Sequence, residues 1–306
     1  MTLAASALRN LPAPAKVNLF LHVTGKRADG YHTLETVFQL IDLCDYLDIE
    51  LRQDGNIVRT SQHDGVPEQT DLCVRAALLL QQHAGRNLGA NIHLTKNIPM
   101  GGGLGGGSSD AATVLIALNY LWSCGLSRPE LARLGLKLGA DVPVFVMGRN
   151  AYATGIGERL HPLTLPMRSF VVVKPAAHVP TPAIFGAPEL TRNTKPIKME
   201  GFTRSGQHLP GRNDLEPVAA GRFKSVAAAL DALKAIASKQ GLDPSSVRMS
   251  GSGACVFVAL DSQANGAEQG SETQNIANQI KQEVSKKRLG KVFVATSLPR
   301  HPLLML

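Results

Sequence analysis

A glycine-rich stretch in the first half of the chain decides the fold: Pro99-Met100-Gly101-Gly102-Gly103-Leu104-Gly105-Gly106-Gly107-Ser108-Ser109-Asp110-Ala111-Ala112. Glycines lack a Cβ, so successive backbone N–H groups can turn inward and form a concave ring of donors for an anion. Ser108 and Ser109 are predicted to cap a helix over residues 111–118, which adds free N–H groups and the positive end of the helix dipole. The stretch therefore predicts a phosphate-binding loop. The alternative is a flexible linker, but a linker seldom lies between an alternating segment (residues 91–96) and a helix that is apolar on every face.

Two well-known phosphate-binding loops do not match this stretch. A Walker A loop places Lys directly after its last glycine, whereas here the last glycine is followed by Ser108. Gly101, Gly103 and Gly106 satisfy the dinucleotide pattern G-x-G-x-x-G, but that pattern should follow a buried apolar strand and precede an acid about 20 positions later. Here the preceding strand is half polar, and Pro99 lies between that strand and the glycines. P-loop nucleotide hydrolases and dinucleotide-dependent dehydrogenases are therefore disfavoured.

The composition sets bounds on size and partners. The chain has 306 residues, 44% of them hydrophobic, which is enough for one large or two ordinary domains with proper cores. It carries 32 basic and 24 acidic residues, a net charge of +8, which suits a phosphate-bearing small-molecule substrate and, on charge alone, nucleic acid. The basic residues are scattered, however, and the one dense run, Lys286-Lys287-Arg288, is predicted to be a solvated face. No nucleic-acid partner is therefore expected.

Neither the cysteines nor the histidines show the spacing of a metal site. Cys44, Cys73, Cys124 and Cys255 are far apart without a C-x-x-C pair, so we expect reduced thiols and no disulfide framework. Residues 1–15 lack the basic region of a signal peptide, and no run of about 18 apolar residues predicts a membrane span. We expect a cytoplasmic protein with no membrane partner and no structural metal.

Alternating and periodic apolar patterns predict an α+β chain. Strands are predicted over residues 17–23, 33–42, 46–51 and 90–96, and helices over residues 72–83 and 108–122. A cluster of prolines between residues 162 and 196 separates this half from the rest, and we expect two domains, 1–163 and 164–306. The Gln-rich stretch 261–282 is predicted to be a mobile surface insertion that leads into a helix.

Three motifs occur in order along the chain: Pro14-Ala15-Lys16-Val17-Asn18-Leu19, the glycine-rich stretch, and Met249-Ser250-Gly251-Ser252-Gly253-Ala254-Cys255-Val256-Phe257. Together they resemble the GHMP superfamily of small-molecule kinases, which includes galactokinase, homoserine kinase and mevalonate kinase. The resemblance implies a two-domain α+β architecture, in which a ribosomal-protein-S5-like first domain meets a ferredoxin-like second domain across a cleft. It also implies that residues 99–109 bind ATP and that residues 251–253 complete the anionic pocket. A tight β-turn is the alternative for residues 251–253.

Four further segments narrow this resemblance: residues 16–21, 27–32, 139–145 and 212–216. Within the superfamily they resemble the kinases of a cytidine-diphosphate-linked methylerythritol in the non-mevalonate route to isoprenoid precursors. The resemblance implies transfer of the γ-phosphate of ATP to the 2-hydroxyl of that acceptor. Mg²⁺ is expected to arrive with ATP, because kinases generally use it to offset phosphate charge. Ser109 is a candidate oxygen ligand, and the sequence names no acidic ligand.

Asp141 and Lys16 are the candidate catalytic residues. Asp141 stands among apolar residues two positions before Pro143, so it is expected to be partly buried. A buried acid needs a partner, and Lys16, alone in an apolar strand, can hold it ionised while polarising the acceptor hydroxyl or the γ-phosphate. Asp141 would then accept the proton of the attacking hydroxyl. The alternative is a buried ion pair that joins two elements, whereas the resemblance assigns both residues to the catalytic centre.

The candidate acceptor site centres on aromatic side chains. Tyr31 and His32 follow an Asp-Gly turn, so a loop presents both; the alternative is a tyrosine that covers the edge of the core. The resemblance implies that they hold the cytosine together with Phe185. The substrate-binding residues that it carries over are Asn18, Tyr31, His32, Lys96, Thr181 and Phe185.

Two other classes of protein remain open at this point. A kinase of a different small alcohol would have no use for Tyr31, His32 and Phe185, and a non-catalytic sensor of the same fold would not need Lys16 and Asp141. ADP release measured across several acceptors separates these hypotheses.

Overall fold

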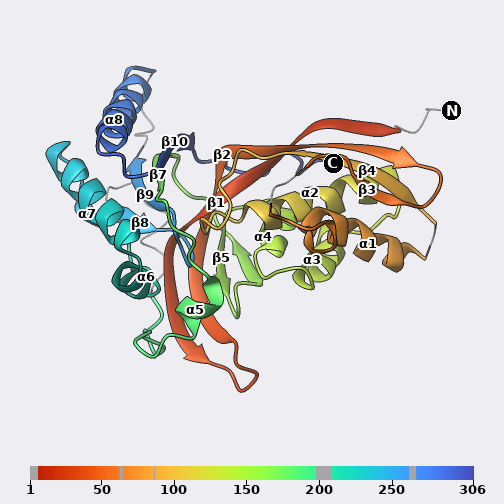
Figure 1. Cartoon of the computed structure of the whole chain (residues 1–306), viewed down its shortest axis with the longest axis horizontal. Helices are drawn as coiled ribbons and strands as arrows, with labels where there is room; N and C mark the ends of the chain where they lie inside the picture. Colours follow the sequence, from red (N-terminus) through yellow and green to blue (C-terminus); the bar gives the residue numbers. More distant parts are fainter. Residues whose placement is uncertain (1–5, 63–64, 86, 198–208, 262–266) are drawn as a thin grey trace.

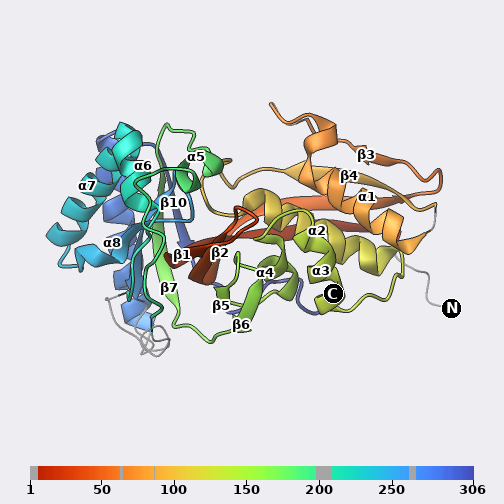
Figure 2. The same cartoon turned by 90° about the horizontal axis from the view of Figure 1, so that it is seen from below.

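The computed structural model describes residues 6–62, 65–85, 87–197, 209–261 and 267–306. The strands are β1 (Ala7–Lys26), β2 (His32–Arg52), β3 (Ile57–Arg59), β4 (Gly89–Thr95), β5 (Ala151–Thr154), β6 (Arg159–Pro162), β7 (Arg168–Lys174), β8 (Val247–Met249), β9 (Val256–Asp261) and β10 (Lys291–Thr296). The helices are α1 (Leu72–Ala84), α2 (Gly106–Leu121), α3 (Arg128–Leu136), α4 (Val142–Met147), α5 (Thr181–Phe185), α6 (Glu216–Arg222), α7 (Lys224–Lys239) and α8 (Ala267–Lys286). Two sheets follow one another along the molecule, with α1 to α4 beside the first and α6 to α8 beside the second (Figures 1 and 2).

A long hairpin forms the backbone of the first sheet. β1 and β2 pair antiparallel along 20 and 21 residues, and the other side of β2 pairs with β4 at one end and β5 at the other. The strand order is β3-β4-β2-β5-β6, with β1 beside β2. Register shifts interrupt the hairpin, one of them between Pro14 and Ala15, and such bulges bend a strand pair. The segments predicted as two strands, 33–42 and 46–51, therefore form one bent strand.

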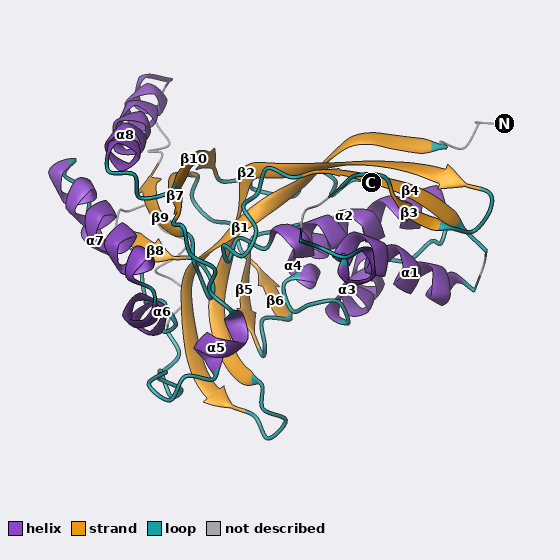
Figure 3. Ribbon diagram, in the orientation of Figure 1, coloured by secondary structure: helices purple, strands orange, loops and turns teal. Residues whose placement is uncertain are grey.

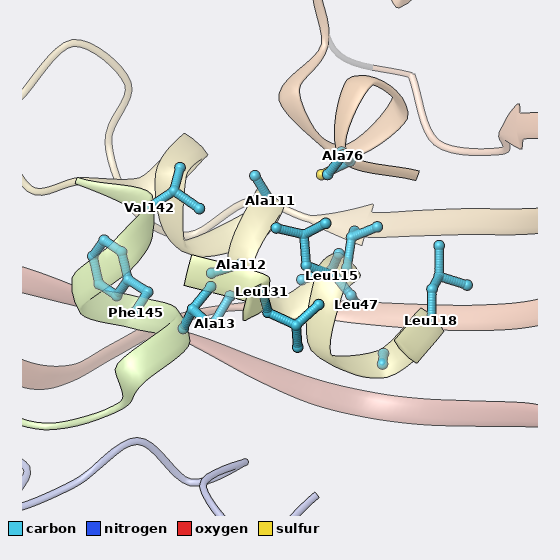
Figure 4. Close-up of a cluster of buried hydrophobic side chains, with 14 of the residues drawn as sticks. Ala13, Leu47, Ala76, Ala111, Ala112, Leu115, Leu118, Leu131, Val142 and Phe145 are labelled. Carbon is cyan, nitrogen blue, oxygen red and sulfur yellow. The ribbon is translucent and has the colours of Figure 1, made fainter. Parts of the chain in front are cut away.

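The first core lies between this sheet and the helices. Helix α2 is buried on nearly every side, as the sequence predicts, and its Ala111, Leu115 and Leu118 pack in the cluster that contains Leu47 of β2 (Figure 4). Phe145 of α4 belongs to the same cluster. The helix that follows the glycine-rich stretch is thus anchored in a closely packed core, which holds its first turn in place.

The second sheet has the connectivity of a ferredoxin-like fold. Its order is β10-β7-β9-β8 and every pairing is antiparallel, while along the chain the elements run β7, α7, β8, β9, α8, β10, with α5 and α6 ahead of α7. Helices α7 and α8 cover the outer face of this sheet (Figure 3). Two unlike sheets joined in one chain confirm the predicted α+β class.

The inner face of the second sheet packs directly on the hairpin. Phe170 and Phe257 meet edge to face with ring centroids 5.7 Å apart, and both belong to a buried cluster with Leu19 and Phe20 of β1. The two sheets therefore share a core, and the loops at their common edge are held in a defined relation.

The start of α2 corrects a prediction. The helix begins at Gly106, its N-cap is Gly105 with φ of +74°, and no side chain caps it. Ser108 and Ser109 lie inside the first turn, so the predicted serine cap is wrong. The reason is that glycine adopts the left-handed conformation at low cost, so the chain turns into the helix before it reaches the serines. The first N–H groups of α2 are left without a side-chain acceptor.

The ends of the second half also differ from expectation. Helix α8 begins at Ala267, inside the Gln-rich stretch predicted as an insertion, and residues 262–266 lie outside the described residues. After β10 the chain returns to the first sheet, where Ser297 bridges Ile41 and Arg300 bridges Arg149. β6 ends at Pro162 and β7 starts at Arg168, so the boundary between 163 and 164 falls in a connection and stays a prediction. Among the described helices, none is both long and apolar enough to cross a membrane.

Candidate active site

Three adjoining cavities lie where the two sheets meet. The loop cavity, of about 560 Å³, is lined by residues 99–108 together with Leu72 and Lys96. The central cavity, of about 340 Å³, is lined by Lys16, Asp141 and residues 251–253. The hairpin cavity, of about 600 Å³, is lined by residues 29–32 at the tip of the β1–β2 hairpin and by residues of α5. Thr181 lines all three cavities, so they meet around this residue.

The glycine-rich stretch lies against the second domain. Backbone N–H groups of Ala254 and Cys255 donate to the carbonyl oxygens of Gly101 (3.3 Å) and Gly102 (3.0 Å). Gly103 has φ of +74°, and a Cβ there would lie 2.1 Å from the carbonyl oxygen of Ser250. Glycine is therefore required here for the close approach of two backbones, in addition to any role toward an anion.

The candidate ATP-binding residues fall into two groups: those up to Ser108 line a cavity, and Ser109 does not. Residues 99–108 line the loop cavity, and Ser108 lines the central cavity as well. Ser109 is fully buried beneath them, lines neither cavity, and its hydroxyl has no hydrogen-bond partner among the described residues. The structure thus offers the hydroxyl of Ser108, and not that of Ser109, to a ligand.

Lys16 and Asp141 meet in the central cavity. Nζ of Lys16 lies 3.2 Å from Oδ2 of Asp141, and the side chains are 3% and 33% exposed. The ammonium also donates to Oδ1 of Asn18 (2.6 Å) and to the carbonyl oxygen of Gly103 (2.9 Å), and it lies 5.3 Å from the ring centroid of Phe38. One buried positive charge therefore touches the glycine-rich stretch and the candidate base at the same time.

A chain of hydrogen bonds orients Asn18 toward this lysine. Its Nδ2 donates to Oγ1 of Thr36 (2.9 Å), whose hydroxyl donates onward to the carbonyl oxygen of Phe20. The backbone N–H of Asn18 donates to Oγ of Ser250 (3.3 Å), and that hydroxyl donates to the carbonyl oxygen of Gly103 (2.9 Å). With its amide nitrogen held, Asn18 presents its oxygen to Lys16.

Lys96 lines the loop cavity, but its charge is already matched. Its ammonium forms ion pairs with Asp45 and with Asp110 (2.8 Å). Burial of Lys96 disfavours its charged ammonium, but the two carboxylates outweigh burial and raise the pKa of Lys96. Burial raises the pKa of Asp110 well above its usual range, although the charge of Lys96 acts to lower it. Asp45 also accepts from the backbone N–H groups of Asn97 (2.6 Å) and Ile98 (2.8 Å). Lys96, predicted as a substrate-binding residue, thus also braces the segment that enters the glycine-rich stretch.

The hairpin cavity brings together the predicted aromatic residues. Tyr31 is 61% exposed, and His32 packs on Phe185 with ring centroids 5.3 Å apart and a tilt of 30°. Oγ1 of Thr181 and Oγ of Ser252 lie 2.6 Å apart, which joins α5 to the glycine-containing turn of the second domain. Side chains from a hairpin tip and a short helix, about 150 residues apart in the sequence, thus face one pocket.

Several residues of the site were not predicted. Asp45 and Asp110 hold Lys96, and Arg192 donates to His32. No spacing in the sequence relates these residues to their partners, because each pair forms only when distant segments fold together. Among the described residues, no group of three His, Cys, Asp or Glu side chains could hold a metal ion.

Comparison with known proteins agrees with this geometry. The family model of the GHMP kinases N terminal domain matches residues 71–149. The chain is 52% identical to 4-diphosphocytidyl-2-C-methyl-D-erythritol kinase of Dechloromonas aromatica, over 95% of this chain and 98% of that protein. It is 56% identical to the protein of that name from Cupriavidus taiwanensis, over 82% and 84% of the two chains.

Solved structures extend the comparison to the fold. A crystal structure of 4-(cytidine 5'-diphospho)-2C-methyl-D-erythritol kinase matches with a TM-score of 0.74 at 36% identity, over 94% of this chain and 98% of that one. A homoserine kinase from Cytophaga hutchinsonii matches with a TM-score of 0.69 at 16% identity, over 98% and 97% of the two chains. The predicted two-domain architecture of the GHMP superfamily is thereby confirmed.

Proposed function

The chain belongs to the family of 4-diphosphocytidyl-2-C-methyl-D-erythritol kinases within the GHMP superfamily, and from this premise we propose the reaction that it catalyses. It transfers the γ-phosphate of ATP to the 2-hydroxyl of 4-diphosphocytidyl-2-C-methyl-D-erythritol, a step of the non-mevalonate route to isoprenoid precursors. The observation that carries this proposal is the position of the Lys16–Asp141 pair in the central cavity, next to both the loop cavity and the hairpin cavity.

ATP fits the loop cavity. Its phosphates would lie against the uncapped first turn of α2, where backbone N–H groups and the positive end of the helix dipole attract an anion. Gly106 and Gly107 line this region without a Cβ that would keep the phosphates away. Mg²⁺ usually keeps several waters and binds few protein oxygens, so the hydroxyl of Ser108 together with the phosphates suits it. The ion would offset charge on the phosphates.

Phosphoryl transfer needs charge stabilisation, alignment and a proton acceptor. Asp141 is the proton acceptor, because its carboxylate lines the central cavity and forms an ion pair with Lys16 there. Lys16 also stabilises the negative charge of the phosphoryl group in transfer, since its ammonium sits beside Gly103 of the phosphate-binding stretch. Asn18 keeps that ammonium in place.

The acceptor lies across the central and hairpin cavities. Its hydroxyl would approach Asp141, while its cytosine would lie between Tyr31 and Phe185, with His32 at the edge of the base. Thr181 lies between the two ends of such a ligand. A cytoplasmic location suits this substrate, and Cys44, Cys73 and Cys255 are free thiols in the structure.

The test is the release of ADP from ATP by the purified full-length chain. We expect turnover with the cytidine-diphosphate-linked methylerythritol and background release with mevalonate, with homoserine or with no acceptor. A methylerythritol phosphate without the base should be a poor acceptor, because it cannot occupy the hairpin cavity. Equal turnover with this truncated acceptor would contradict the proposed substrate, and binding of both ligands without turnover would contradict the kinase assignment.

A further inference from the structure

Arg192 forms a contact with His32 that the proposed reaction does not explain. Its Nε lies 3.1 Å from Nε2 of His32, and both residues line the hairpin cavity. The rest of the guanidinium donates to carbonyl oxygens, those of Leu190 (2.9 Å), Phe185 (3.1 Å) and Ala187 (2.6 Å). Arg192 is therefore held rigidly by the segment at the end of α5 and aims one N–H group at the imidazole.

This contact determines where the imidazole carries its proton. Arginine has five donors and no acceptor, so Nε2 of His32 must be the acceptor of the hydrogen bond. Burial, and then the positive charges of Arg192 and Lys26, lower the pKa of His32, so the ring is neutral near pH 7. A neutral ring with an unprotonated Nε2 carries its hydrogen on Nδ1, and no described residue accepts a hydrogen bond from that atom. His32 therefore offers a ligand in the cavity one donor.

A hydrogen-bond donor held in one position can distinguish cytosine from uracil. Position N3 accepts a hydrogen bond in cytosine but carries a hydrogen in uracil, so a donor that faces this edge pairs with the first and opposes the second. We propose that Arg192 is a positioning residue that holds His32 in the Nδ1–H form and thereby makes the site select cytosine over uracil in its acceptor. This inference rests on the proposed function, since it takes the hairpin cavity as the site of the base.

A matched control variant separates the proposed positioning role of Arg192 from a merely structural role. Arg222 also braces this segment, since it donates to the carbonyl oxygen of Ala183 (3.1 Å) and pairs with Glu189 (2.8 Å), but it does not contact His32. Arg192→Met and Arg222→Met each remove a brace on the segment around α5. Only the first also removes the donor to the imidazole.

The experiment compares kcat/KM for cytidine- and uridine-diphosphate-linked methylerythritol on the full-length parent and both variants. The parent should prefer the cytidine-linked acceptor by roughly 10- to 100-fold, the value of one hydrogen bond made against one opposed. In Arg192→Met this preference should fall severalfold through a higher KM for the cytidine-linked acceptor, with kcat nearly unchanged. In Arg222→Met the preference should stay at the parent value. An unchanged preference in Arg192→Met, or an equal loss in both variants, overturns the proposal.

A measurement on the parent alone covers the case in which Arg192→Met does not fold. Nitrogen-15 NMR of the histidine rings, with His32 assigned from a His32→Gln sample, should show a protonated Nδ1 and an unprotonated Nε2. A proton on Nε2 overturns the proposal. If neither linked acceptor is phosphorylated by the parent, the proposed function fails. The NMR result and the ratio of Kd for CDP and UDP, measured with ADP saturating the loop cavity, then still decide the role of Arg192.

Discussion

Lys16 is a charged residue whose side chain is almost completely buried. Its side chain is 3% exposed, and the oxygens of Asn18, Gly103 and Asp141 surround its ammonium. Burying an ammonium is costly unless such partners replace water. Of the three, only Asp141 contributes an acidic side chain, and among the described residues Lys16 is its only ion-pair partner. The exposed part of that carboxylate is therefore available to the acceptor.

Asp141→Asn is expected to lower kcat by roughly 10²- to 10⁴-fold, the usual contribution of a positioned proton acceptor. The KM values for ATP and for the acceptor should change only a few fold, because the amide keeps the shape of the side chain and can still accept from Lys16. Steady-state kinetics measure both effects, and thermal melting verifies the fold. Asp231→Asn, at an exposed position of α7, is the matched control and should keep the parent rate. Parent-like turnover of Asp141→Asn would leave Asp141 as a structural partner only.

At the scale of elements, different surroundings constrain the two halves of the glycine-rich stretch. A Cβ on Gly103 would collide with the backbone of Ser250, so this half is shaped by the contact with the second domain. Gly107 lies in the first turn of α2, where a Cβ would meet only Leu72, at 3.3 Å. A substitution at Gly103 therefore disturbs the domain junction, whereas one at Gly107 tests the anion site.

Gly107→Ala is expected to raise the KM for ATP by roughly tenfold or more, because the added methyl group enters the loop cavity where phosphates approach the helix start. Its melting temperature should be equal to that of the parent or higher, since Ala is favoured over Gly in a helix by about 1 kcal/mol. Gly221→Ala in α6 is the control: a Cβ there meets nothing within 4 Å, so it should leave the KM for ATP unchanged. An unaltered KM in Gly107→Ala would refute the binding of phosphates at this helix start.

At the scale of the whole molecule, the chain closes on itself. The residues after β10 leave the second sheet and pack on the first core through Leu303 and His301. His301 is 1% exposed; its backbone donates to Gly148, and its Nδ1 accepts from the backbone of Leu303 (3.0 Å). Burial, and then the charge of Arg128, lower the pKa of His301 to about 3. The C-terminal segment is thus fixed on the first domain by a histidine that is neutral in the folded state.

This histidine makes stability depend on pH in a defined direction. Because the pKa of His301 is depressed in the folded state, the unfolded chain binds the proton first, and stability is lost as pH falls below about 6.5. At pH 5 the loss amounts to about 2 kcal/mol, from 1.36 kcal/mol for each of about 1.5 pH units. His301→Asn keeps an acceptor for the backbone of Leu303 but does not titrate. Urea unfolding at pH 7 and pH 5 should therefore show a smaller acid loss in this variant.

The control for this prediction is His93→Asn at an exposed position of β4, which should lose as much stability on acidification as the parent. Equal acid losses in the parent and in His301→Asn would show that His301 does not remain neutral in the folded protein.

The local chemistry of the sequence was sufficient to predict a loop at the glycine-rich stretch and an ion pair between Lys16 and Asp141. A run of glycines before an apolar helix predicts a tight loop whose backbone N–H groups can face an anion, and a lone charge in an apolar segment needs a partner of opposite charge. Parts of β1, β2, β4, α1 and α2 were predicted for the same reason, since period and apolar pattern belong to short segments. Residue roles toward ATP and cytosine remain predictions that rest on the family.

The start of α2, the partners of Lys96 and the contact of His32 were decided only by the tertiary structure. The left-handed turn at Gly105 starts α2 ahead of the serines, Asp45 and Asp110 compensate Lys96, and Arg192 meets His32 from 160 positions away. None of these follows from spacing, because a backbone angle at a packed junction and a contact between distant loops depend on the shared core that brings two sheets together. Charge and hydrogen bonding in the site are therefore properties of the folded chain, while the sequence by itself determined which segments would build it.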